Sequence, residues 1–156
     1  MVVNHQIIQS KVDSVIFLQA LSDLLVHTHA DLLMVWRVDF AQNELLFDTS
    51  VKRGGGIWPE GGIIPAVTEA SHVKTVVRLL NGEVVCDPPQ NYPSNLLLRH
   101  LTTDGYAYLC AVPVPPTAND MIFGILYIVW RKMPDSAETH AAMSLGRSSA
   151  GRMIER

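Results

Sequence analysis

The two cysteines, Cys86 and Cys110, are the side chains of this chain best suited to covalent or redox chemistry. They could form a redox pair, or one thiol could act as a nucleophile. Cys110 alternates with apolar residues of a strand-like run, on the same side as Tyr108 and Val112, where a thiol behaves as a small hydrophobic group. Cys86 is followed by Asp87, and no cation nearby in the sequence would activate it. We therefore expect two inert thiols.

Histidines are the next candidates, as metal ligands or as ligand contacts. His27 and His29 are two residues apart at the end of a predicted helix, so their side chains point in different directions. No cysteine or carboxylate cluster joins them, and a helix C-terminus favours histidine electrostatically. We expect a structural role here and no metal site. His100 follows a run of leucines and could contact a ligand or coordinate a haem iron.

The glycine-rich segment 54–62 does not match a nucleotide-binding loop. Gly54-Gly-Gly56 and Gly61-Gly62 are not followed by Gly-Lys-Ser/Thr, and their spacing differs from a dinucleotide fingerprint. A mobile lid over a pocket is one interpretation, and a plain connector is the other. The acidic residues are dispersed, and nothing pairs them for acid–base catalysis: Asp39, Asp48, Glu60, Glu69 and Asp87. We expect no enzymatic activity.

Composition excludes several classes of protein. Apolar residues make up 48% of the chain and charged residues 17%, which is typical of a folded domain and not of a disordered segment. The net charge of −3, with scattered Lys and Arg, argues against nucleic acid or an anionic membrane surface as a partner. The longest apolar run, 122–130, is too short to span a bilayer, and no signal-peptide pattern opens the chain. We expect one cytoplasmic domain over residues 1–156.

The first predicted element is a helix over 7–27, a segment that contains no Gly or Pro. Its apolar residues follow helical spacing on two sides, with Phe17, Leu21 and Leu24 on one and Val12, Ile16 and Ala20 on the other. This is more apolar surface than one core contact requires. We therefore expect the helix to pack against its own sheet and against a second helix, from the same chain or from a partner.

Hairpin-joined strands fill the rest of the chain between helices. The clearest alternation lies in 31–40, where Leu32, Met34, Trp36, Val38 and Phe40 share one face. Asp135, with Glu138 three residues later, resembles a capping box for a last helix. In chain order, the predicted elements after the first helix are strands 31–40 and 44–51, helix 68–80, strand 83–87, helix 95–101, strands 106–114 and 121–131, and the last helix. This order favours a single antiparallel sheet in an α+β domain.

Three segments resemble the GAF family in this order and at these separations: 30–39 (ADLLMVWRVD), 79–87 (LLNGEVVCD), and 105–114 (GYAYLCAVPV) leading to 123–127 (FGILY). The resemblance implies an antiparallel sheet of five to six strands, with the N- and C-terminal helices on one face and a pocket covered by loops and helices on the other. It also implies a signal-transduction sensory domain that binds a small molecule. Such domains relay the signal through their terminal helices, often as homodimers, to a downstream output domain.

The same resemblance places a set of side chains around the pocket, mostly apolar and aromatic with a few polar tips, as is usual for a small-molecule site. They are Met34 and Trp36 from the first strand, Trp58 from the glycine-rich loop, Leu97 and His100 from the short helix, Leu109 and Ala111 from the penultimate strand, and Tyr127 and Val129 from the last strand. The alternative for each apolar residue is that it fills a closed core.

The pigment-binding branch of the family is matched less well. Its members carry Pro-x-x-Asp-Ile-Pro where this chain has WPEGGIIP over 58–65, without the Asp. Their attachment cysteine falls near Leu96, where no cysteine is present. We expect no covalently attached cofactor and no bilin, and the cysteine cluster of the methionine sulfoxide-reducing branch is also missing. Two alternatives to the small-molecule sensor are a ligand-free dimerisation module and a haem- or tetrapyrrole-binding sensor.

Overall fold

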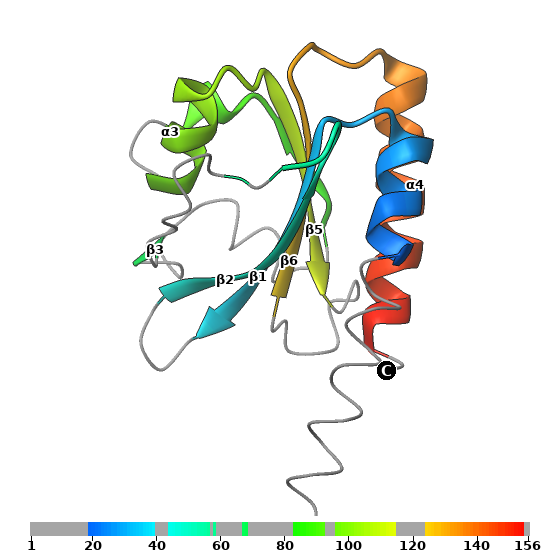
Figure 1. Ribbon diagram of the computed structural model, residues 1–156, viewed down its shortest axis with the longest axis horizontal. Coiled ribbons are helices and arrows are strands. Elements are labelled where there is room, and N and C mark those ends of the chain that lie inside the picture. The colour runs from blue at the N-terminus through cyan, green and yellow to red at the C-terminus, as the bar shows by residue number, and fades with distance from the viewer. Residues whose placement is uncertain are drawn as a thin grey trace, which may run out of the picture.

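The computed structural model describes residues 19–39, 44–56, 58, 67–68, 83–92, 96–114 and 124–154. Six strands form one sheet in the order β3-β2-β1-β6-β5-β4, and every neighbouring pair is antiparallel (Figure 1). The strands are β1 (Leu32–Asp39), β2 (Glu44–Lys52), β3 (Val67–Thr68), β4 (Val85–Asp87), β5 (Tyr108–Val114) and β6 (Gly124–Trp130). The single antiparallel sheet expected from the sequence is confirmed.

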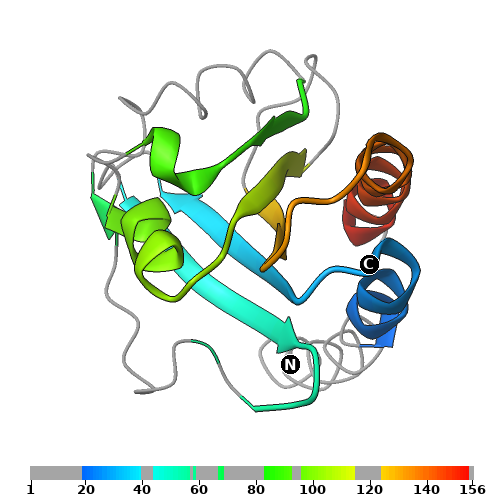
Figure 2. The same cartoon turned by 90° about the horizontal axis from the view of Figure 1, so that it is seen from above.

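Helices cover both faces of this sheet. The N-terminal helix, described over 19–28, lies beside α4 (Ser136–Ile154) on one face, while α3 (Leu96–Thr103) lies on the opposite face (Figure 2). A short 3-10 helix, η2 (Pro89–Asn91), connects β4 to the segment before α3. No helix in the ranges given above combines the length and the apolar character needed to cross a bilayer.

Strand alternation divides the interior into two cores. Along β1, Met34 and Trp36 face α3, whereas Leu33 and Val35 face α4. The α3-side core consists of Leu32, Met34, Trp36, Leu45, Trp58, Val85, Leu97, Leu98, Leu101, Tyr106, Leu109, Ala111, Ile125, Tyr127 and Val129. The α4-side core consists of Leu21, Leu24, Leu25, Ala30, Leu33, Val35, Cys110, Val112, Val114, Leu126, Ile128, Trp130 and Ala142. Because both faces are covered, every residue of β6 is buried.

The elements start and end close to the predicted bounds, with a few differences. Thr68, predicted to begin a helix, lies in β3, and the remainder of that helix falls outside the described residues. The same is true of Phe40, of the 41–43 turn and of residues 7–18. The first helix ends at Thr28, whose hydroxyl donates to the Leu24 carbonyl at 2.8 Å. His29 follows in a left-handed conformation, with a φ of 57°.

The predicted capping box at the start of α4 is confirmed. The Glu138 backbone N–H donates to Asp135 Oδ1 at 2.7 Å, and the Asp135 N–H donates to Glu138 Oε1 at 3.2 Å. Replacing Asp135 with Ala is expected to lower the free energy of unfolding by about 1 kcal/mol, because α4 loses a side-chain acceptor for its first-turn N–H groups. Urea denaturation measures this, with Asp135→Asn as the control that keeps an acceptor. Equal losses in the two variants would contradict the assignment.

Gly146 explains how α4 can lie close to the sheet. A Cβ atom at this position would meet Ile128 Cδ1 and Val112 Cγ2, each at 3.0 Å. From the sequence, this glycine only lowers helix propensity. In the structure it allows close approach of α4 to β5 and β6, the two strands that carry these side chains.

Candidate functional site

The side chains predicted to bind a ligand gather on the α3 face of the sheet. With the exception of His100, all of them belong to the α3-side core: Met34, Trp36, Trp58, Leu97, Leu109, Ala111, Tyr127 and Val129. They come from β1, β5, β6, α3 and the glycine-rich loop, segments far apart in the sequence. The fold therefore brings the set together, while a role in binding stays a prediction.

His100 lies apart from this set. Its side chain is exposed in the last turn of α3, whereas Leu97, Leu98 and Leu101 of the same helix are buried in the α3-side core. The helical phase that turns three leucines inward turns His100 toward solvent. In this arrangement His100 does not line the α3-side core.

Trp36 is the most unusual member of the core. Its side chain is 1% exposed, and its indole Nε1 has no hydrogen-bond partner within the part of the chain that the structure describes. Its ring meets that of Phe47 edge-on, with centroids 5.6 Å apart. Leaving a buried donor unsatisfied costs about 1–3 kcal/mol, and buried polar groups are normally paired. The indole N–H is therefore a donor available to an acceptor that reaches this face.

Tyr127 supplies a second polar group in the same core. It pairs with Met34 of β1 and with Ala111 of β5, and its side chain is buried. Burial raises the pKa of the Tyr127 phenol far above its usual range, because the phenolate would be desolvated. The hydroxyl consequently stays neutral at physiological pH. Within the described ranges, this face offers apolar area with a few neutral polar groups and no buried charge.

Trp58 is attached to the turn after α3 by a network that the sequence did not reveal. Its indole Nε1 donates to Asp104 Oδ2 at 2.9 Å, and Arg131 Nη1 donates to the Asp104 carbonyl at 2.9 Å. The Arg131 guanidinium also lies over the Tyr106 ring, 4.4 Å from its centroid. This network connects the loop after β2 with the ends of α3 and β6. Its members are too far apart in the chain for any local pattern to identify them.

Removing the acceptor of Trp58 tests this network. Asp104→Ala is expected to lower the free energy of unfolding by about 1–2 kcal/mol, because the partly buried indole N–H loses its partner. Equilibrium denaturation measures the loss. Asp104→Asn keeps an oxygen acceptor and should retain most of the stability. An Asp104→Ala protein as stable as the wild type would show that the contact does not hold Trp58.

Comparison with known proteins identifies the architecture. No family model matches the sequence, and no curated protein matches it. Solved structures do match. The GAF domain region of a protein from Geobacter sulfurreducens PCA has a TM-score of 0.67 at 16% identity, over 97% of this chain and 98% of that chain. The chain has a GAF-like fold.

Two further structures share this GAF-like fold. The phycocyanobilin-bound GAF domain from a cyanobacterial phytochrome has a TM-score of 0.63 at 12% identity, over 97% of this chain and 88% of that chain. The GAF domain of a two-component sensor histidine kinase from Bacillus halodurans has a TM-score of 0.60 at 14% identity, over 88% of this chain and 89% of that chain. At these identities the likeness concerns the fold.

The glycine-rich loop of this GAF-like domain leaves β2 in a left-handed conformation. Gly54, Gly55 and Gly56 have φ angles of 81°, 84° and 87°, and all three are exposed. Residues with a Cβ atom rarely adopt a positive φ, so the backbone path requires the three consecutive glycines. Of the predicted lid over 54–62, residues 57 and 59–62 lie outside the described ranges.

The two cysteines correct the expectation of inert thiols. Cys86 of β4 and Cys110 of β5 are directly opposite each other in the ladder and form a disulfide, with their Cα atoms 4.1 Å apart. Cys110 lies in the α4-side core beside Val112, as the alternation predicted. The pairing was missed because each cysteine was assessed within its own strand. Only the register of β4 on β5 brings residues 24 apart in the sequence into contact.

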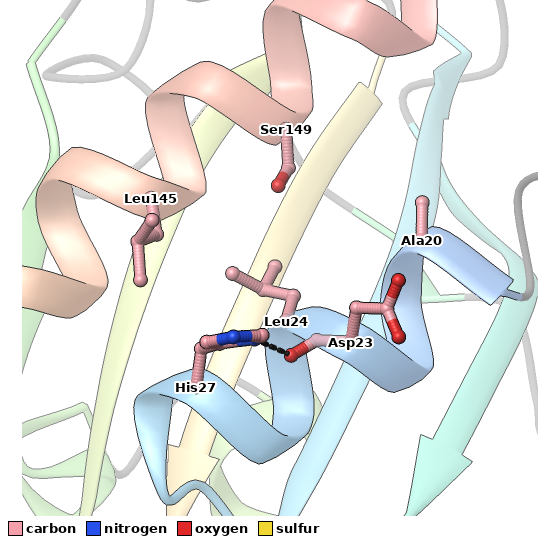
Figure 3. A pocket seen from close by; sticks show the side chains of 6 residues that line it. All are labelled: Ala20, Asp23, Leu24, His27, Leu145 and Ser149. Carbon is pink, nitrogen blue, oxygen red and sulfur yellow. Dashed lines mark hydrogen bonds between the residues drawn. The ribbon is translucent and has the colours of Figure 1, made fainter.

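A groove of about 370 Å³ lies between the N-terminal helix and α4. Figure 3 shows its lining: Ala20, Asp23, Leu24 and His27 from the first helix, with Leu145 and Ser149 from α4.

The ring N–H of His27 donates to the Asp23 carbonyl at 2.6 Å, whereas Nδ1 of His29 lies 3.4 Å from a Glu138 oxygen. The two histidines thus contact separate partners. Among the residues described, no three His, Cys, Asp or Glu side chains are grouped to hold a metal ion.

Proposed function

We propose that this GAF-like domain is a sensory regulatory module that binds a small molecule between α3 and the Trp36 face of the sheet. The observation that carries the proposal is the buried indole N–H of Trp36 without a partner among the described residues. One structural neighbour is described as a phycocyanobilin-bound GAF domain. This chain would bind its ligand on the α3 face, where the resemblance to the GAF family implies a pocket. The module would sense and would not catalyse.

The chemistry of the face defines the class of ligand. The surrounding side chains are apolar or aromatic, and the donor offered by Trp36 requires an acceptor such as a carbonyl oxygen or a ring nitrogen. A planar, largely apolar molecule with one acceptor fits these requirements. The core residues are almost fully excluded from solvent, so α3 and the loop carrying Trp58 must move outward for the ligand to enter. Binding would then select an open arrangement of these segments.

A route for the signal lies in the sheet itself. β1 contributes Met34 and Trp36 to the α3-side core and Leu33 and Val35 to the α4-side core. Protein interiors are close-packed, so a shift of β1 on one face alters packing on the other. The N-terminal helix and α4 would pass this change to an output domain in the cytoplasm. Exposed apolar side chains on these helices, Val26 and Leu145, suit a homodimer contact.

A ligand-free interaction module is the second candidate. The closed packing of the α3-side core favours it, because a core that fills its own volume needs no ligand. The geometry does not support the haem-binding alternative, because the exposed side chain of His100 does not line the α3-side core. An absorption spectrum of the protein after addition of haem tests it directly.

A thermal-shift screen with aromatic and heterocyclic metabolites that carry carbonyl or ring-nitrogen acceptors separates the two leading candidates. A ligand at a hundredfold excess over its Kd stabilises the protein by about 2.7 kcal/mol. Trp36→Phe should weaken binding of such a compound about tenfold, because an aromatic ring remains but the N–H donor is lost. Trp58→Phe is the matched control, since the N–H of Trp58 is already bound to Asp104. A dimer that no compound stabilises would favour the interaction module.

A further inference from the structure

The disulfide between Cys86 and Cys110 links β4, an edge strand of the sheet, to β5. β4 is three residues long and is the last strand in the order, so that among the described strands only β5 pairs with it. Cys110 is completely buried, whereas Cys86 is partly exposed at the edge of the α4-side core. Cys86 is therefore the more accessible residue of the pair.

β4 joins the disulfide to the opposite face of the sheet. Val85, the neighbour of Cys86, points the other way and is buried in the α3-side core. After β4, the hydroxyl of Tyr92 donates to the Asp87 carboxylate, and the Tyr92 side chain packs against the same core. η2, which lies between them, contacts α3. The covalent link thus holds the first strand of a segment, 85–92, that helps to cover the Trp36 face.

We propose that Cys86–Cys110 is a redox-responsive cross-link whose opening by a dithiol reductant loosens β4 and η2 over the α3-side core. In a reducing cytoplasm, disulfides are usually transient and often redox-sensing, which agrees with this role. The inference goes beyond the proposed ligand site. It would stand if no ligand were found, because it depends only on the disulfide and on the segment that the disulfide holds.

The chemical step is a thiol–disulfide exchange. A thiolate of the dithiol attacks the sulfur of Cys86, the more accessible residue of the pair. A mixed disulfide forms there, and the sulfur of Cys110 leaves as a thiolate and takes up a proton. The second thiol of the reductant then attacks the reductant's other sulfur, which is bonded to Cys86 in the mixed disulfide. This releases Cys86 as a thiol and leaves the reductant as a disulfide. The protein gains two electrons and two protons, and the reverse reaction with an oxidised dithiol restores the link.

The test compares the wild-type chain equilibrated with reduced or with oxidised dithiothreitol under native conditions. Alkylation after an acid quench and unfolding counts free thiols, and hydrogen exchange measured by mass spectrometry reports local opening. We expect neither cysteine to be alkylated in the oxidised sample and both to be alkylated in the reduced sample. Amide exchange over 85–91 is expected to become roughly tenfold faster on reduction, while exchange over 124–130 in β6 stays the same.

Cys86→Ala is the control, because it cannot form the link and should exchange at the reduced rate in both buffers. If this variant does not fold, the wild-type comparison is sufficient. Three results would overturn the proposal: free thiols in the oxidised sample, a disulfide that native protein does not release to excess reductant, or identical exchange over 85–91 in the two states.

Discussion

Trp36→Ala is expected to lower the free energy of unfolding by about 3–5 kcal/mol, because it removes a large side chain from a closed core. The indole is 1% exposed and contacts the ring of Phe47 edge-on. Neither β1 nor its neighbouring strands can move into the space without breaking the sheet ladder on both sides of position 36. Equilibrium denaturation in urea measures the loss. A change below 1 kcal/mol would contradict the closed packing around Trp36.

Trp36→Phe keeps an aromatic ring at position 36 and removes the indole N–H. It removes less volume than the alanine variant, and it also removes a buried N–H that has no partner among the described residues. We therefore expect a loss of about 1 kcal/mol or less. The same exchange at Trp58 removes an N–H that donates to Asp104 and should cost more. If Trp36→Phe proves as costly as Trp58→Phe, the indole of Trp36 has a partner after all.

Gly146→Val is expected to destabilise the domain by about 2–3 kcal/mol, because the new side chain would overlap Ile128 and Val112. The overlap pushes α4 away from the sheet, and α4 also forms one wall of the groove between the terminal helices. The effect should therefore extend to any output that depends on helix position. Denaturation measures the stability, and the radius from small-angle scattering measures the compactness of the domain.

Ser148→Val is the matched control for Gly146→Val. Ser148 lies on the exposed side of the same helix, so the same new side chain meets solvent there. Its cost should stay within about 0.5 kcal/mol, as for most surface substitutions. Similar losses at positions 146 and 148 would show that helix propensity, and not the contact with the sheet, is the reason for the glycine.

The periodic part of the sequence predicted the fold well. Alternation in β1 assigned Met34 and Trp36 to one face and Leu33 and Val35 to the other, and the structure has both pairs where they were expected. The spacing of Asp135 and Glu138 located the start of α4. These signals are local, since each depends on residues within one turn or one strand. Local signals are what a single sequence records most clearly.

The features that the sequence did not predict depend on pairing between distant segments. The disulfide requires the register of β4 on β5, and the partner of Trp58 is 46 residues away at Asp104. His100 was placed with the site by the resemblance to the GAF family, but the phase of α3 turns its side chain to solvent. The sequence also does not predict that Trp36 Nε1 lacks a hydrogen-bond partner in the described part of the chain. This becomes evident only when the atoms around the indole are known.

The central claim is that the indole N–H of Trp36, which has no partner among the described residues, pairs with an acceptor on the ligand. A nitrogen–proton correlation spectrum resolves the indole signals of the three tryptophans, and Trp36→Phe assigns the relevant one. During titration with the compound that stabilises the protein most, the Trp36 indole proton should move downfield, while that of Trp58 stays near its starting position. A Trp36 signal that no compound of the library shifts would contradict the account.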